Sequence, residues 1–254
     1  MSCTTRGKIW LADIKRTRQS VGVIGSVGSM LLYLIRHAQS QNNARPAYCR
    51  VEDPPLTAVG RLQTHYLAQW MRRFEFDMLV TSPVLRAVQT TRAIHDRTGH
   101  HVHVWANLFE EGGIFRGFGP QASEGGPGLK RSQVGGLAAS NPKLCTLDPS
   151  ITEAGWWGRT RESPDEASRR ASDVAKRLTL CVRNQGRGVV VVTHADFKRR
   201  LLDCLLGKSL ESLQVNRLSN TGVTKLKLDS SVWRLSYLDE VAHLPPRLVT
   251  GIKV

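Results

Sequence analysis

Four consecutive valines, at residues 189–192, constrain the fold more than any other feature of the chain. β-Branched side chains favour extended backbone. An uninterrupted apolar run leaves no polar face for solvent, so a strand made of these residues is expected to be buried on both sides. This pattern is typical of a central strand in a parallel sheet that helices cover on both faces.

Other strands alternate with helical segments along the chain. Strands are predicted at residues 31–35, within 76–81 and 100–105, and as a final antiparallel pair at 221–228 and 232–238. The helix after the valine run is expected to end at Gly207 and to place residues 198–200 on its solvated face. The alternation predicts an α/β fold, a three-layer sandwich with a mainly parallel central sheet flanked by helices.

Local signals predict where several helices begin. Ser163, Pro164 and Glu166 form a capping-box pattern. Ser82 followed by Pro83 predicts a second helix start, because serine caps helices and proline suits their first turn. The helix after the segment PPLTAVG is predicted to bury one face, which carries Leu62, Tyr66, Leu67 and Trp70.

The chain is long enough for one domain, which we place at residues 30–254. Glycine, serine and proline accumulate from residue 112 to 149, which predicts a long loop or a loop-rich insertion at about 112–160. Residues 1–29 are basic and are expected to be a flexible extension. A mitochondrial presequence and a signal-peptide core are alternatives for this segment. Its apolar run is too short and too interrupted to be a membrane span.

Composition restricts the compartment and the class of ligand. The chain is 41% hydrophobic and 22% charged, which suits a folded protein in water. A net charge of +15 attracts phosphorylated small molecules, polyanions or acidic lipids, and no motif points specifically to nucleic acid. The five cysteines are odd in number and contain no C-x-x-C pair, so we expect the reducing cytoplasm. Nothing in the composition indicates an oligomeric state.

Two of the predicted strands end in histidine. Arg36 and His37 follow the strand at residues 31–35, and His194 follows the valine run. Ligands of open α/β sheets bind beyond the carboxyl ends of the strands, so both histidines are expected in one crevice. Arg86 lies one turn into a predicted helix, whose amino-terminal end also attracts anions. These groups together predict a phosphate site.

The chemistry of phosphoryl transfer fits these residue types. Arginine offers paired donors to phosphate oxygens, and it disfavours the charged form of a nearby histidine. A neutral imidazole is a competent nucleophile. The leaving alkoxide needs a proton, which Glu110 or Glu111 in the segment NLFEEGG can supply. No group of acidic residues suggests a metal site.

Five blocks resemble the histidine phosphatase superfamily, the phosphoglycerate mutase-like fold. They are LIRHAQSQNN, PLTAVGRLQ, TSPVLRAVQTT, VVVVTHADF and LSNTGVTKL, and they occur in the family's order. The resemblance implies a phosphatase without cofactor or metal, acting on a small phosphorylated substrate through phosphohistidine. It implies His37 as nucleophile and Glu110 as proton donor. It implies phosphate or substrate binding by Arg36, Asn43, Arg86, His194 and Ala195.

The chain departs from the family pattern at a few positions. Ala38 and Ala195 replace usual glycines, and Gln39 replaces a usual glutamate. The Trp-Arg-Leu-Asn-Glu-Arg block of the cofactor-dependent mutases has no counterpart, which favours hydrolysis over mutase activity. A mutase-type phosphotransferase and a catalytically idle anion-binding module remain alternative hypotheses at this point.

Overall fold

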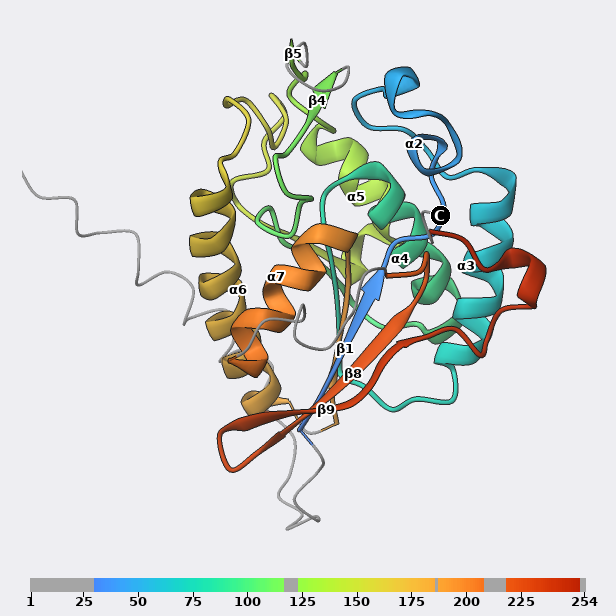
Figure 1. Cartoon of the computed structure of the whole chain (residues 1–254), viewed down its shortest axis with the longest axis vertical. Coiled ribbons are helices and arrows are strands. Elements are labelled where there is room, and N and C mark those ends of the chain that lie inside the picture. Colours follow the sequence, from blue (N-terminus) through green and yellow to red (C-terminus); the bar gives the residue numbers. More distant parts are fainter. Residues whose placement is uncertain (1–29, 117–122, 186, 208–217, 252–254) are drawn as a thin grey trace, which may run out of the picture.

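The computed structural model describes residues 30–116, 123–185, 187–207 and 218–251, which form a three-layer α/β sandwich (Figure 1). The predicted amino-terminal extension, residues 1–29, lies outside the described residues. Within the described ranges, no helix combines the length and the apolar character needed to cross a bilayer.

A seven-stranded sheet forms the middle layer, in the order β6-β3-β2-β7-β1-β8-β9. Its strands are β1 (Met30–Arg36), β2 (Met78–Thr81), β3 (Val102–Val104), β6 (Cys145–Leu147), β7 (Val189–Thr193), β8 (Val223–Asp229) and β9 (Val232–Glu240). The strands from β6 to β1 in this order are parallel, whereas β8 and β9 are antiparallel to their neighbours. The predicted fold class and the antiparallel final pair are confirmed. A separate hairpin joins β4 (Phe115–Arg116) to β5 (Ser123–Glu124).

The valine run is the central strand of the sheet. All five residues of β7 are buried, between β2 on one side and β1 on the other. Val189 and Val191 pack into the hydrophobic core on one face, and Val190 and Val192 pack into the core on the other. The strand therefore supplies side chains to two cores, as its sequence predicts.

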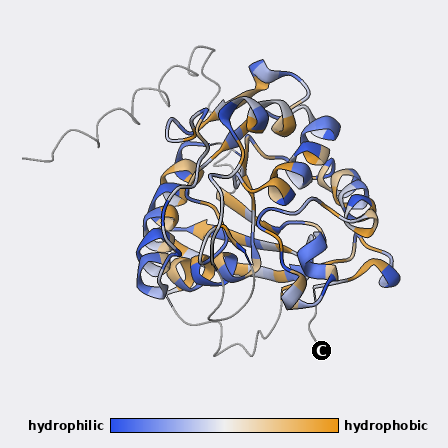
Figure 2. Ribbon diagram, turned by 90° about the horizontal axis from the view of Figure 1, so that it is seen from above, coloured by the Kyte–Doolittle hydropathy of each residue, from blue (hydrophilic) through white to orange (hydrophobic). Residues whose placement is uncertain are grey.

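Helices cover both faces of the sheet. They are α2 (Gln41–Ala44), α3 (Ala58–Met71), α4 (Leu85–Thr98), α5 (Arg131–Ala138), α6 (Pro164–Asn184) and α7 (Ala195–Leu206), with short 3-10 turns at Ala47–Cys49, Pro142–Leu144 and Pro246–Leu248. Buried residues of α6 and α7 share one core, and those of α3, α4 and α5 share the other. Figure 2 shows the resulting pattern, with hydrophobic strands inside and hydrophilic helix surfaces outside.

The predicted ends of α6 and α7 are confirmed. Ser163 caps α6, where its side chain accepts from the Glu166 N–H and the Glu166 carboxylate accepts from the Ser163 N–H. Gly207 ends α7 in the left-handed conformation, with φ of 66°. Both ends therefore follow from local residue chemistry alone.

The predicted buried face of α3 is wrong in part. Leu67 is buried, but Leu62 is 52% exposed and Tyr66 and Trp70 are only partly covered. The helix instead buries Gln63, whose amide nitrogen donates to the carbonyl of Leu248 at 2.7 Å. The same face buries Thr64, Ala68 and Met71, so the helix is rotated away from the predicted stripe.

The predicted start of α4 at Ser82 and Pro83 is also wrong, because the first helical residue is Leu85. The carboxylate of Asp53 accepts from the Leu85 N–H at 3.0 and 3.1 Å, so a distant acid caps this helix. The Ser82 hydroxyl accepts from the Val84 N–H at 3.3 Å and also lies 2.8 Å from His194 Nε2.

The region from residue 112 to 149 is not a plain loop. It contains the β4–β5 hairpin, α5, and the edge strand β6, which pairs with β3. These elements are short, and the pairing that defines β6 is with a distant strand, so local sequence patterns do not reveal it.

The prediction that Lys198 lies on the solvated face of its helix is wrong. Its side chain is fully buried, its Nζ donates to the Gly222 carbonyl at 2.9 Å, and it lies 3.6 Å from a carboxylate oxygen of Asp239. Burial lowers its pKa to about 8. Lys198 thus joins α7 to the turn that leads into β8.

Two leucines of α3 test which face of this helix is buried. We expect Leu67→Ala to lower the free energy of unfolding by about 2–5 kcal/mol, because it leaves a cavity in a closed core. Leu62→Ala, the matched control on the same helix, should change it by less than about 0.5 kcal/mol. Urea denaturation measures both values, and equal losses would contradict the assigned face.

Candidate active site

The pairing of β1 with β7 brings the two predicted histidines together. Arg36 is opposite Thr193 in the parallel ladder, so the residues that follow each strand leave the sheet at the same edge. The His37 N–H donates to the Thr193 carbonyl at 2.9 Å. The rings of His37 and His194 are 5.1 Å apart between centroids and inclined by 61°. The expected convergence of the two histidines is therefore present.

The amino-terminal end of α4 brings Arg86 to the same place. Its Nε donates to His37 Nε2 at 3.0 Å. The Asp53 carboxylate lies 3.8 Å from the Arg86 guanidinium and therefore balances part of its charge. Just before the helix, the Ser82 hydroxyl lies 2.8 Å from His194 Nε2. One short segment thus contacts both histidines.

Arg36 is held by backbone carbonyls. Its Nη1 donates to the carbonyls of Leu218 and Gly251. Arg36 Nε and His194 Nδ1 are buried, and neither has a hydrogen-bond partner in the described part of the chain. Unpaired buried polar atoms are costly, so these two atoms are candidates to bind an oxyanion.

Burial is the main reason that both imidazoles are neutral. It lowers the pKa of His37 well below the usual value, and the nearby Arg86 and Arg36 guanidiniums lower it further. Burial and Arg86 lower the pKa of His194 in the same way. His37 Nδ1 lies 2.7 Å from the Ala38 carbonyl, which requires an N–H there. Nε2 is then the nitrogen that carries the lone pair, and this lone pair accepts from Arg86 Nε.

Glu110 and Glu111 have different surroundings. Glu110 Oε1 accepts from the N–H groups of Glu111 and Phe197, at 2.9 and 3.0 Å, at the start of α7. Burial and then the nearby Asp196 carboxylate raise the pKa of Glu110. Glu111 instead forms a two-point ion pair with Arg200 on the outer side of α7. Of the two carboxyl groups, Glu110 is the one whose environment favours a bound proton.

The remaining predicted residues, Ala195 and Asn43, lie beside the histidines, arginines and Glu110. Ala195 is the first residue of α7 and follows His194 directly. The Asn43 side-chain oxygen accepts from the Ser40 N–H at 3.1 Å and from the Asn220 amide at 3.4 Å. Asn220 in turn donates to the His37 carbonyl at 3.0 Å. Asn43 therefore contacts the loop that supports His37.

Three residues near the histidines escape the sequence analysis: Ser82, Asp53 and Asn220. Ser82 was expected to cap a helix, and its contact with His194 joins positions that are 112 residues apart. Asp53 and Asn220 carry no local signal, except that Asn220 lies within the block LSNTGVTKL. Their roles depend on contacts between distant segments.

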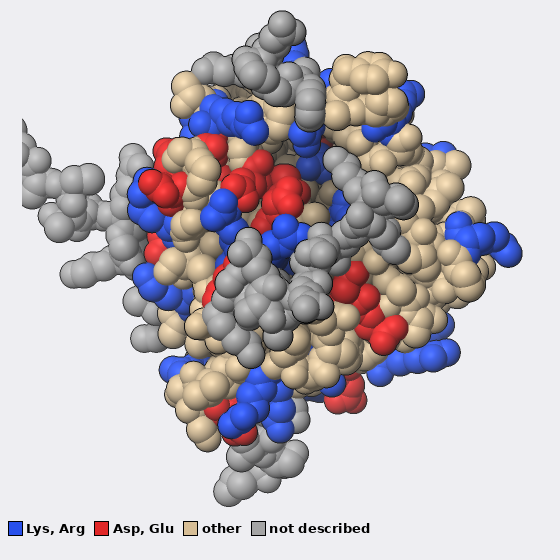
Figure 3. All heavy atoms as spheres, in the orientation of Figure 1, with Lys and Arg blue, Asp and Glu red and all other residues tan. Residues whose placement is uncertain are grey.

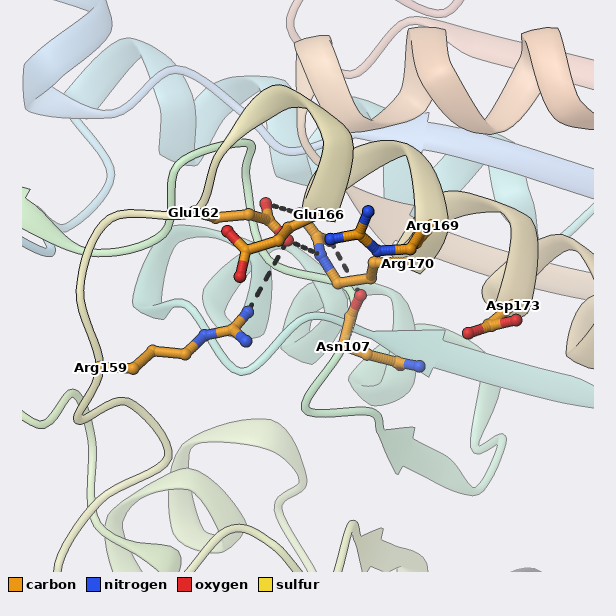
Figure 4. A pocket seen from close by; sticks show the side chains of 7 residues that line it. All are labelled: Asn107, Arg159, Glu162, Glu166, Arg169, Arg170 and Asp173. Atoms are coloured by element: carbon orange, nitrogen blue, oxygen red, sulfur yellow. Dashed lines mark hydrogen bonds and ion pairs between the residues drawn. The ribbon is translucent and has the colours of Figure 1, made fainter.

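A pocket of about 390 Å³ lies apart from the histidines and arginines described above. Its walls include Asn107, Glu162, Arg170 and Asp173, mostly from α6 and the segment before it (Figure 4). None of the histidines lines it. Within the described residues, no three His, Cys, Asp or Glu side chains gather as a group able to hold a metal ion.

Comparisons with known proteins find relatives that match most of this chain. A protein from Hydrogenobacter thermophilus with the provisional name phosphoserine phosphatase 2 is 25% identical over 84% of this chain and 96% of its own length. A 2,3-bisphosphoglycerate-dependent phosphoglycerate mutase from Methylorubrum extorquens is 26% identical over 83% of this chain and 96% of its own. The solved structure of a mycobacterial glucosyl-3-phosphoglycerate phosphatase shares the fold, with a TM-score of 0.56, 22% identity, and coverage of 83% and 99% of the two chains.

The family model covers both histidines and most of the described sheet. It matches residues 32–127 and 140–240, which contain β1 from Leu32 onward, all of β7, and the site residues described above except Gly251. The chain belongs to the histidine phosphatase superfamily, branch 1.

Proposed function

We propose that this protein is a metal-independent phosphomonoester hydrolase that works through a phosphohistidine on His37. The observation that carries the proposal is the contact of His37 Nε2 with Arg86, because it points a neutral lone pair at a cationic group that can hold a phosphate. Two relatives with phosphatase in their names, a phosphoserine phosphatase and a glucosyl-3-phosphoglycerate phosphatase, support the same reaction class.

The geometry suggests how the first step proceeds. His37 Nε2 attacks phosphorus, and the bond to the ester oxygen breaks in line with the attack. Arg36, Arg86 and His194 bind the equatorial oxygens, whose charge grows in the transition state. Glu110 gives its proton to the leaving alkoxide. The products of this step are a free alcohol, phosphohistidine and a Glu110 carboxylate.

The second step returns the enzyme to its starting state. The Glu110 carboxylate takes a proton from water, and the water oxygen attacks the phosphorus of phosphohistidine. The P–N bond breaks, inorganic phosphate leaves, and His37 and Glu110 regain their first protonation states. Asn43 in α2 and Ala195 at the start of α7 are proposed to complete the phosphate site.

A mutase-type phosphotransfer is the second candidate, because a relative is a phosphoglycerate mutase. The two reactions differ in what accepts the phosphoryl group from His37. Incubation with 3-phosphoglycerate, with and without 2,3-bisphosphoglycerate, separates them. Hydrolysis releases inorganic phosphate, whereas a mutase forms 2-phosphoglycerate with little release.

We propose the cytoplasm as the location. The described cysteines, Cys49, Cys145, Cys181 and Cys204, are all unpaired, which suits a reducing compartment. A mitochondrial location depends on residues 1–29, which lie outside the described part. Fluorescence microscopy of the full chain carrying a carboxyl-terminal tag distinguishes the two.

Replacement of His37 tests the nucleophile. With 4-nitrophenyl phosphate and EDTA present, we expect the wild type to release phosphate and His37→Ala to lose activity by at least about 10³-fold. Rapid quenching of the wild type should trap acid-labile phosphate on His37. His101→Ala is the control, because His101 contacts only Thr146 among the hydrogen-bond partners given by the structure. Full activity of His37→Ala would refute the mechanism.

The pH dependence tests Glu110 as the acid. The reaction needs neutral His37, so kcat/KM rises with pH through a lowered pKa, well below 6.5. It also needs protonated Glu110, so kcat/KM falls as pH rises through the raised pKa of that group. We expect Glu110→Gln to remove this alkaline decline.

The leaving group provides a second readout for Glu110. Glu110→Gln should lower kcat/KM by about 10²- to 10⁴-fold for glycerol 3-phosphate, whose alkoxide needs a proton. The loss should be much smaller for 4-nitrophenyl phosphate, whose phenolate leaves unprotonated. Glu111→Gln serves as the matched control, because Glu111 is paired with Arg200. Equal losses on the two substrates would exclude Glu110 as the acid.

A further inference from the structure

Two arginines stack on one aromatic ring at the side of the active site. The guanidinium carbons of Arg50 and Arg161 lie 4.4 and 4.7 Å from the centre of the Phe115 ring. They are therefore no more than about 9 Å from each other. Neither forms an ion pair with an acid among the described residues. Arg159 differs, because it also stacks on aromatic rings but lies 3.7 Å from the Glu162 carboxylate.

Arg50 lies close enough to the active site to interact electrostatically with its charged groups. Burial lowers the pKa of Arg50, while the carboxyl groups of Glu110 and Asp196 act in the opposite direction. Arg50 also contributes to the lowered pKa of Arg86, after the larger effect of burial. These mutual effects require that the Arg50 guanidinium lies within electrostatic range of both Glu110 and Arg86.

Arg161 passes over the turn that follows Glu110. Gly112 has a positive φ of 86°, and a Cβ added to it would lie 3.3 Å from Arg161 Nε. The missing side chain of Gly112 thus leaves space for the guanidinium beside the turn. Basic and acidic side chains lie side by side on this face, between α7 and β4 (Figure 3).

We propose that Arg50 and Arg161 bind a second anionic group of the substrate. The inference rests on the proposed phosphatase function, and it names the substrate class as phosphomonoesters whose leaving group carries a carboxylate or a further phosphate. Two neighbouring cations repel each other, and an anion that contacts both offsets that repulsion while it gains charge-assisted hydrogen bonds. Stacking on Phe115 orders both guanidiniums before the ligand arrives.

Matched substrates test this second anion site. We expect the wild type to prefer 3-phosphoglycerate over glycerol 3-phosphate, which lacks the carboxylate, in kcat/KM. Arg50→Gln and Arg161→Gln should each lower that ratio about tenfold or more, because each removes a hydrogen bond to a charged group. Lysine at either position should restore only part of the ratio, because it lacks the forked donors. Glycerol 1,3-bisphosphate shows whether phosphate replaces carboxylate as the second anion.

The controls separate failure of this inference from failure of the proposed function. Arg159→Gln should leave the substrate ratio unchanged, because Arg159 already has an acidic partner. A wild type with no preference for the anionic substrates, or a ratio that neither arginine affects, would overturn the second anion site and leave phosphatase activity intact. A wild type that cleaves no phosphoester would overturn the proposed function itself.

A second, independent feature is the buried ion pair of Arg170 and Glu162 (Figure 4). Arg170 Nε and Nη2 donate to the two Glu162 oxygens at 2.7 and 2.5 Å. Nη1 donates to the carbonyls of Asn107 and Phe109, each at 3.0 Å. The guanidinium carbon also lies 3.7 Å from the centre of the Phe109 ring and 3.9 Å from that of Phe197.

These contacts involve the residues that hold Glu110 in place. Phe109 directly precedes Glu110, and the Phe197 N–H donates to Glu110 Oε1. Arg170 therefore fixes both backbone segments that determine where the Glu110 carboxyl lies. We infer that Arg170 is a positioning residue for the proposed acid, and that Glu162 orients Arg170.

A double-mutant cycle tests this positioning role, using kcat/KM for glycerol 3-phosphate. Arg170→Lys should lower it about tenfold or more in the wild-type background, because lysine lacks the forked donors that reach Glu162 and both carbonyls. It should add little in the Glu110→Gln background, because no acid then remains to be positioned. Arg177→Lys is the matched control, since Arg177 lies on the same helix and stacks on Trp105. The positioning role would be refuted if the losses in kcat/KM added fully in the double variant. It would also be refuted if Arg170→Lys left kcat/KM unchanged.

Discussion

The parallel pairing of β1 with β7 is the constraint on which the candidate site depends. In this register Arg36 is opposite Thr193, so the next residue of each strand is a histidine at the same edge of the sheet. A shift of one residue would turn one ring toward a helix layer. The two-faced burial of β7 makes such a shift costly, because every one of its side chains is enclosed. Core packing and site geometry are therefore specified by the same residues.

The site also concentrates positive charge where water is excluded. Arg36 and Arg86 are each only 8% exposed. Burying unpaired charges is costly unless hydrogen bonds or opposite charges compensate. Backbone carbonyls compensate Arg36, and Asp53 compensates Arg86 only partly, from 3.8 Å. The positive charge that remains uncompensated favours binding of an anion. Together with burial, it keeps both imidazoles in the neutral form that nucleophilic attack requires.

Much of this site could be predicted from the sequence. The other residues could not, for reasons that the structure identifies. His37, His194 and Arg86 follow strand ends and a helix start, which are local signals. Ser82 and Asn220 act through contacts across 112 and 183 residues, and no local pattern reports such distances. The burial of Gln63 and Lys198 was not predicted, because tertiary hydrogen bonds hold these polar groups inside.

The sheet order has a consequence for how the chain is made. Among the described strands, β1 pairs with β7 and β8, and Leu32 lies opposite Val189 and Leu226. During synthesis this apolar strand leaves the ribosome long before either partner exists. Unpaired apolar strands are prone to aggregate, so we expect the nascent chain to be vulnerable to aggregation until β7 and β8 have emerged. Refolding in vitro should likewise be slow, because distant pairings must close before the sheet is complete.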